Sequence, residues 1–142
     1  SEGVASFQGG LWRIGGGSGP TNTYIDDIWK IRSNLPWIRT EGTSALLPRH
    51  GHKLVPSGKL LYSIGGWKAL RHADFSTSIH DLSDQVWSSE DGLNWKLMDS
   101  HAPFGMRWNP AVASFKGRLW VVAGYLRNGR EYMNDIWYME TP

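Results

Sequence analysis

Three stretches of the chain share one order of apolar and turn-forming residues. They cover residues 4–16, 53–66 and 112–124, and each has a short apolar stretch, a turn signal and a second apolar stretch that ends at glycine. The second stretch is almost continuously apolar, as in Leu119–Val122. Strands that are covered on both faces have this composition. We therefore expect three β-hairpins whose second strands are buried on both sides.

The turn of each expected hairpin contains glycine. Glycine adopts φ > 0 without steric cost, and two-residue hairpin turns require that conformation. We place the three turns at Gly9-Gly10, Ser57-Gly58 and Lys116-Gly117. A third strand is expected at the Asp/Gln-(Ile/Val)-Trp motif that follows each hairpin, at residues 27–29, 85–87 and 135–137.

The spacing of the Trp residues tests this alignment. Trp29 and Trp87 are 58 residues apart, and so are Trp37 and Trp95. Trp87 and Trp137 are 50 residues apart. The difference of eight residues falls in one place, between the second and third strands of the middle repeat. The chain is therefore built from internal repeats with one insertion, and the repeat decides the fold.

Four strands are expected in each of the first two repeats and three in the last. A fourth strand begins at Trp37 and at Trp95, whereas the third repeat ends at Pro142, five residues after Trp137. Repeats of roughly 50 residues with four antiparallel strands are typical of β-propeller blades. The sequence predicts an all-β chain of three blades, the last without its outer strand, at residues 1–47, 48–105 and 106–142.

The repeats resemble kelch repeats in the hairpin turn, the glycine pair after the second strand and the Trp beyond it. Two positions depart from that family: Ala123-Gly124 replaces the glycine pair, and the first repeat lacks the arginine found before the first strand at Arg49 and Arg107. Residues 88–95 resemble a degenerate Asp-box turn, in which Glu90 takes the place of the Asp of the Asp-box motif. The resemblance implies a propeller scaffold, and we interpret this turn as structural.

Three blades are too few to close a propeller, because known rings have about four to eight. An open set of blades would expose an apolar sheet face at each end. Either the chain is a piece of a longer protein, or a second copy completes the ring. Six blades are common in the family that the chain resembles, so we expect a homodimer that closes a six-bladed ring.

Composition and charge exclude several classes of function. The chain has no Cys, which rules out disulfides, thiolate metal sites and cysteine nucleophiles. The formal net charge is +2 and no basic run of five or more residues occurs, so no nucleic-acid partner is expected. No apolar run approaches the roughly 20 residues of a membrane helix. We therefore expect a soluble protein with no membrane partner. No signal peptide is recognisable in residues 1–3, and the compartment is undetermined.

Loops on one side of the expected ring are the candidate binding surface. In an up-and-down blade, the connections from the second to the third strand and from one blade to the next lie on the same side. The eight-residue insertion, between Trp67 and about Leu82, belongs to this side. Functional residues concentrate on loops held by a rigid scaffold. The ligand-binding side chains predicted there are Arg49, His50, Arg71, His72, Arg107, Trp108 and Arg127.

Two pairs in this region support more than one interpretation. Arg49 and Arg107 could bind a carboxylate or phosphate at the mouth of the channel, or donate to loop carbonyls of the neighbouring blade, as the arginine of kelch-like repeats often does. His50 and His52 alternate on one strand, a spacing that can chelate Zn²⁺. No third ligand follows from the spacing, so structural or solvated histidines are expected and neither a metal nor a cofactor is predicted.

The nine Trp residues fall into two groups. Trp67 and Trp108 lie on loops, where an indole ring suits stacking on a sugar. The other seven recur with the repeats and are expected in the core: Trp12, Trp29, Trp37, Trp87, Trp95, Trp120 and Trp137.

These observations favour a non-catalytic interaction module whose ligand is a protein segment or a small anionic or carbohydrate molecule. No catalytic residue is predicted. Two alternatives stay open, a sugar-converting enzyme similar to the sialic-acid epimerases that share this scaffold, and a structural fragment without a ligand. A copper-radical oxidase, which also resembles the repeats, needs a Tyr–Cys cross-link, and the chain contains no Cys.

Overall fold

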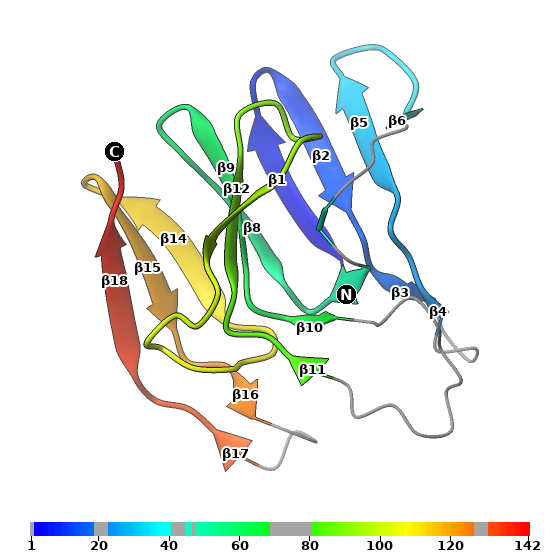
Figure 1. Ribbon diagram of the computed structural model, residues 1–142. Coiled ribbons are helices and arrows are strands. Elements are labelled where there is room, and N and C mark those ends of the chain that lie inside the picture. Colours follow the sequence, from blue (N-terminus) through cyan, green and yellow to red (C-terminus); the bar gives the residue numbers. More distant parts are fainter. Residues whose placement is uncertain (1, 19–22, 41–44, 47, 69–80, 127–130) are drawn as a thin grey trace.

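The computed structural model is all-β, which confirms the expected fold class (Figure 1). It describes residues 2–18, 23–40, 45–46, 48–68, 81–126 and 131–142. Within these ranges no helix is long and apolar enough to cross a membrane. Every strand pairing in the described part is antiparallel.

Three larger sheets hold most of the strands. The first sheet has the order β1 (Gly3–Phe7), β2 (Gly10–Ile14), β5 (Ile28–Arg32) and β6 (Ile38–Thr40). The second has the order β8 (Lys53–Ser57), β9 (Leu60–Ile64), β12 (Val86–Ser89) and β13 (Lys96–Asp99). The third has the order β14 (Ala111–Phe115), β15 (Arg118–Val122) and β18 (Ile136–Glu140).

Short strands lie together on one side of these sheets (Figure 1). β3 (Gly17–Ser18) pairs with β4 (Thr23–Tyr24), and β16 (Tyr125–Leu126) pairs with β17 (Glu131–Tyr132). Between them, β10 (Trp67–Lys68) pairs with both β7 (Arg49–His50) and β11 (Asp81–Leu82). We call this side of the molecule the hairpin side.

The hairpin turns between the first two strands of each sheet differ in part from the expected positions. The turns are Gln8-Gly9, Gly58-Lys59 and Lys116-Gly117, so two of the three are shifted by one residue. Both Gln8-Gly9 and Lys116-Gly117 have positive φ at each position, which is the type I′ requirement. In Gly58-Lys59 only the glycine does, as in a type II′ turn. Gly10 and Ser57, expected in the turns, are strand residues.

Each larger sheet has two faces, and equivalent residues lie on the same face in all three sheets. The forward face contains Ala5, Phe7, Trp12, Ile14 and Ile28 in the first sheet, Val55, Tyr62, Ile64 and Val86 in the second, and Ala113, Phe115, Trp120, Val122 and Ile136 in the third. The rear face contains Val4, Leu11, Trp29 and Ile31, then Leu54, Leu61 and Trp87, then Val112, Leu119, Val121 and Met139.

The core consists of two junctions in which a forward face packs on a rear face. The forward face of the first sheet packs on the rear face of the second, in a cluster with Leu46, Leu93 and Trp95. The forward face of the second sheet packs on the rear face of the third, in a cluster with Ala102 and Phe104. The first strands β1, β8 and β14 lie next to one another, with β8 in the middle. The second sheet is therefore covered on both faces.

The expectation that seven Trp residues lie in the core is only partly correct. Trp12 and Trp95 are buried, and Trp29, Trp87 and Trp120 are half-buried. Trp37 and Trp137 are exposed, at 43% and 36% of their surface. Trp120 lies on the forward face of the third sheet, which no other described sheet covers, and Trp137 lies on an edge strand. Repetition in sequence predicts the position of each ring in its sheet but not how well the ring is covered.

The Asp/Gln-(Ile/Val)-Trp motif has a direct structural explanation. The indole N–H of Trp29 donates to the Asp27 carboxylate at 2.5 Å, and the corresponding bond in the third sheet joins Trp137 to Asp135 at 2.7 Å. In the second sheet the side-chain oxygen of Gln85 is the acceptor for Trp87 at 3.1 Å. The first residue of the motif thus fixes the indole ring of the Trp in its third position by one side-chain hydrogen bond. This bond requires an acceptor oxygen, which both Asp and Gln provide.

The turn at residues 88–95 is held by side-chain to backbone hydrogen bonds, but the acidic residue that accepts them is Asp91, one residue after the expected Glu90. Asp91 Oδ1 accepts the backbone N–H of Leu93 at 2.8 Å and of Asn94 at 2.7 Å, while Glu90 makes no side-chain bond of this kind among the described residues. Ser89 Oγ accepts the N–H of Gly92 at 2.8 Å. Burial raises the pKa of Asp91, but the hydrogen bonds from Asn94, Leu93 and Ser89 outweigh it and lower the pKa to about 2.

Gly92 allows this turn to pack against the Trp12 ring of the first sheet. Its φ is +79°, and a Cβ there would lie 2.7 Å from the Trp12 ring. Gly105 provides a matched comparison, because its φ is +75° and no described atom lies within 4 Å of its Cβ position. We expect Gly105→Ala to cost about 1–2 kcal/mol for the backbone alone. Gly92→Ala should cost a further 1–3 kcal/mol, roughly, for overpacking.

Urea unfolding of the two variants and the unchanged chain measures both costs. Equal losses for Gly92→Ala and Gly105→Ala would show that the Trp12 ring yields freely, and would contradict the tight packing of the turn.

Candidate functional site

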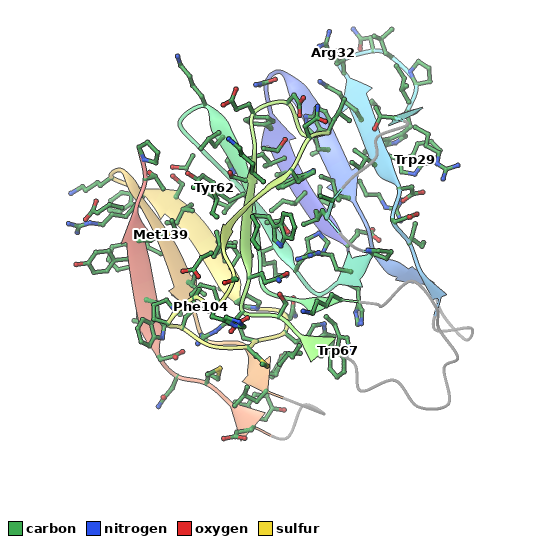
Figure 2. The ribbon with its side chains drawn as sticks, viewed as in Figure 1. Trp29, Arg32, Tyr62, Trp67, Phe104 and Met139 are labelled. Carbon is green, nitrogen blue, oxygen red and sulfur yellow. The ribbon has the colours of Figure 1, made fainter. Side chains whose placement is uncertain are left out.

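Five aromatic rings form a continuous row on the hairpin side. His50 stacks on Trp67 with ring centroids 6.2 Å apart, and it meets the edge of Trp108 at 5.9 Å. Trp108 lies 5.5 Å from Tyr125, which lies 5.0 Å from Tyr132. We call these residues the aromatic row. Figure 2 shows Trp67 on the same side as the short hairpins, away from the turns at the other end of the sheets.

The repeat explains why these rings meet. His50 pairs with Trp67 in the short sheet of the second repeat, and Trp108 forms the equivalent bridge to Tyr125 in the third. Trp67 and Tyr125 each follow the glycine that ends a second strand. Two repeats therefore place their aromatic side chains at matching positions, and the rings of one repeat contact those of the next.

A glycine fixes the position of Trp108. Gly51 has φ +67°, and a Cβ at this position would lie 1.7 Å from Trp108 Nε1, so the ring lies directly on the backbone. The next residue, Asn109, donates its backbone N–H to the Gly51 carbonyl at 2.8 Å. Asn109 itself has φ +52°, a left-handed conformation that Asn tolerates better than most residues. The indole is thus held by main chain on one side and by His50 and Tyr125 on the others.

The row changes from half-buried to exposed along its length. His50, Trp67, Trp108 and Tyr125 are half-buried, whereas 72% of the Tyr132 surface is exposed. The Nε1 atom of Trp108 is buried and has no hydrogen-bond partner among the described residues. The row is closed by main chain at Trp108 and open at Tyr132. An exposed aromatic ring suits the C–H surface of a ligand.

Arg107, expected at the channel mouth, is fully buried. Its guanidinium forms a bidentate pair with Asp135 at 2.9 and 3.0 Å and donates to the carbonyls of Ala123, at 2.9 Å, and Phe104. The guanidinium thus donates to loop carbonyls, as the alternative expects, but Ala123 belongs to the same repeat as Arg107 and Phe104 lies only three residues before it. In this arrangement the donors of Arg107 have acceptors inside the protein, and its contact with a ligand stays a prediction.

Arg49 is buried in the equivalent place, with 1% of its surface exposed. Burial lowers its pKa to about 10, and its guanidinium lies 5.8 Å from the centre of the Trp87 ring. Both arginines also join neighbouring sheets through their main chain. Gly16 donates its N–H to the carbonyl of Arg49, and Gly66 donates to that of Arg107, each at 2.9 Å. The arginine segments are therefore structural connections between one sheet and the next.

His50 and His52, whose spacing could chelate Zn²⁺, lie in different surroundings. His50 belongs to the aromatic row, whereas His52 is fully buried against the backbone of Gly66. Burial holds the pKa of His52 well below its usual range, so the ring is neutral. Within the described ranges, no three His, Asp or Glu side chains are grouped so that they could hold a metal ion.

Three of the predicted binding residues, Arg71, His72 and Arg127, lie outside the described residues. Three members of the aromatic row, Trp67, Tyr125 and Tyr132, were not among the predicted site residues, although Trp67 was named as a ring that suits stacking on a sugar. Tyr125 could have been found, because it follows Gly124 as Trp67 follows Gly66. Nothing in the sequence indicates that Tyr132 reaches the same row, since its strand is only two residues long.

The Arg107–Asp135 pair predicts how stability depends on pH. The hydrogen bonds from Arg107 lower the pKa of Asp135 to about 2. The stabilisation is therefore present above the unfolded pKa, near 4, and is lost as the pH falls towards 2. Asp135→Asn should lower the unfolding free energy at pH 7 by up to about 3 kcal/mol and reduce its fall between about pH 4 and 2.

Glu140→Gln is the matched control, because Glu140 pairs with Arg118 at the surface and exposed pairs contribute little. Chemical unfolding at several pH values gives both quantities. An Asp135→Asn chain as stable as the control at pH 7 would mean that the buried pair does not hold the third sheet together.

No known family model matches the chain. The candidate site therefore stands on the geometry of its own residues, and the aromatic row is the feature of that geometry that ends in an exposed ring, Tyr132.

Proposed function

We propose that the chain is a non-catalytic binding module whose hairpin side binds a carbohydrate. In this proposal the three larger sheets are consecutive kelch-like blades of a β-propeller, at residues 1–47, 48–105 and 106–142, and a second copy completes a six-bladed ring. The short hairpins lie on the side of the ring that receives the ligand.

The repeated geometry supports the blades. Each larger sheet starts with the same hairpin, and each hairpin pairs its second strand with the strand of the Trp motif. A forward face meets a rear face at both junctions, and a glycine N–H donates to an arginine carbonyl at both. Similar units related by similar contacts are the organisation of a propeller.

The aromatic row is the observation that supports the ligand class. His50 and Trp67 are stacked, and the other rings meet edge to face or at a tilt, so that the row ends in the ring of Tyr132. Flat aromatic surfaces bind the C–H faces of sugar rings. Tyr132 is open to solvent and belongs to no hydrophobic cluster of the described core. An exposed ring joined to a fixed row has the arrangement expected of a stacking platform.

The burial of two arginines changes the expected charge preference. An anionic ligand was expected because Arg49 and Arg107 suit a carboxylate, but both side chains are buried, that of Arg107 in a pair with Asp135. We therefore propose that neutral sugars bind as well as their acidic counterparts. A peptide ligand is a competing outcome, and so is a chain that binds neither.

Titration with saccharides tests this proposal. The probes are galactose, N-acetylglucosamine, their disaccharides and sialic acid, followed by calorimetry and by Trp fluorescence. Tyr132→Ala should weaken binding by up to about tenfold, because one aromatic contact contributes about 0.5–1.5 kcal/mol. Tyr132→Phe should retain most of the affinity.

Trp37→Ala is the control, since Trp37 is an exposed indole at the β5–β6 turn and not in the aromatic row. Saccharide binding that Tyr132→Ala leaves unchanged, or the absence of binding by any probe, would refute the assignment of the row.

A further inference from the structure

Two sheet faces at opposite ends of the chain are exposed and apolar. On the forward face of the third sheet, 59% of the Phe115 surface and 65% of the Ile136 surface are exposed. On the rear face of the first sheet, the values are 48% for Val4 and 40% for Leu11. Figure 2 shows Trp29, which belongs to this rear face, on the side of the first sheet that is turned away from the other two. No other sheet of the described chain covers either face.

Each exposed face has an equivalent that is buried elsewhere in the same molecule. Phe115 and Ile136 correspond to Phe7 and Ile28, which are only 5% and 2% exposed because the second sheet covers them. The exposed Leu11 corresponds to Leu119, which is 0% exposed because the second sheet covers it from the other side. The two end faces therefore carry the kinds of residue that both internal junctions bury.

We infer that the forward face of the third sheet packs on the rear face of the first sheet of a second copy of this chain, and that the contact occurs twice. This inference rests on the proposed six-bladed ring and assigns its interface. It follows from the two observed junctions, because both join a forward face to a rear face and neither joins like faces. The association is thus head to tail, and two contacts close the ring.

Charges on the two faces do not oppose this contact. Arg13 takes the place of Val121 and would be buried, but it pairs with Glu2 at 3.4 Å and lies 3.8 Å from Asp27. On the third sheet, the charge of Arg118 is balanced by Glu140 at 2.7 Å. Arg13 and Arg118 therefore bring their own counter-charges. Arg39, which lies opposite Trp29 on the edge strand β6, is exposed and has no ion pair within the described residues.

A pair of substitutions tests the head-to-tail arrangement. Light scattering after gel filtration should give about twice the chain mass of 16.0 kDa for the unchanged protein. Ile136→Glu alters the forward face and Leu11→Glu the rear face, and each variant alone should be monomeric because each alters both contacts of the ring. Mixing the two variants should restore a dimer, since the mixture retains one unaltered contact.

Leu97→Glu is the matched control, because Leu97 is 44% exposed on β13 of the second sheet and lies on neither end face. It should remain dimeric. Circular dichroism and melting temperature confirm that each variant is folded, and the recovery of a dimer on mixing shows it independently.

A cross-link tests the register of the same contact. Ser57 Oγ and Ser114 Oγ lie 2.9 Å apart across the second junction. The residues equivalent to them in the inferred interface are Phe115 and Ser6 of the other copy. Because the chain has no Cys, mild oxidation of the Ser6→Cys/Phe115→Cys double variant should give a disulfide-linked dimer. Neither single variant should cross-link.

The outcomes separate the inference from the proposals on which it depends. A monomeric unchanged chain at micromolar concentration would refute both the ring and this interface, and another protein segment would then cover the faces. A dimer that Ile136→Glu leaves intact, or that Ser6→Cys/Phe115→Cys fails to link, would preserve the dimer but overturn the assigned faces. Saccharide binding is measured separately, so its loss or retention by Tyr132→Ala does not bear on these results.

Discussion

The structure depends on one constraint: each larger sheet is apolar on both faces and is stable only when both are covered. The second strand of each hairpin places bulky side chains alternately on the forward and rear faces, so no single sheet can satisfy its own surface. The second sheet meets this requirement completely, and Leu61, Tyr62 and Ile64 in its β9 strand are fully buried. Stacking of like units therefore follows from the composition of one strand.

Main-chain and polar contacts determine how the stacked sheets are oriented. Gly16 and Gly66, which both have positive φ, each donate to the carbonyl of the arginine that precedes the first strand of the next repeat. Arg107 then joins the loop at Phe104, at the end of the second repeat, to Ala123 and Asp135 of the third. Apolar packing alone would allow neighbouring sheets to slide, whereas these directional bonds fix one register.

Much of the fold could be predicted from the sequence because it depends on periodicity. The order of apolar stretches and turn residues in residues 4–16 and in its two copies predicted the hairpins and the all-β class. The Trp spacing predicted where the third strands lie. What failed depends on single contacts. Asp91 rather than Glu90 organises the 88–95 turn, since a backbone N–H must lie within reach of the carboxylate, and only the folded turn shows which residue meets that condition. The candidate site was harder still, because the burial of Arg107 depends on Asp135, 28 residues away along the chain.

The contact between Gly51 and Trp108 has a consequence for how this protein can vary. The indole occupies the volume that any side chain at residue 51 would need, while the equivalent residue in the next repeat, Asn109, keeps the left-handed backbone and carries a side chain. The two positions are therefore epistatic: a larger residue at 51 is tolerable only after Trp108 has become smaller. Among variants of this protein, residue 108 should be replaced first and residue 51 second, and the reverse order should be rare.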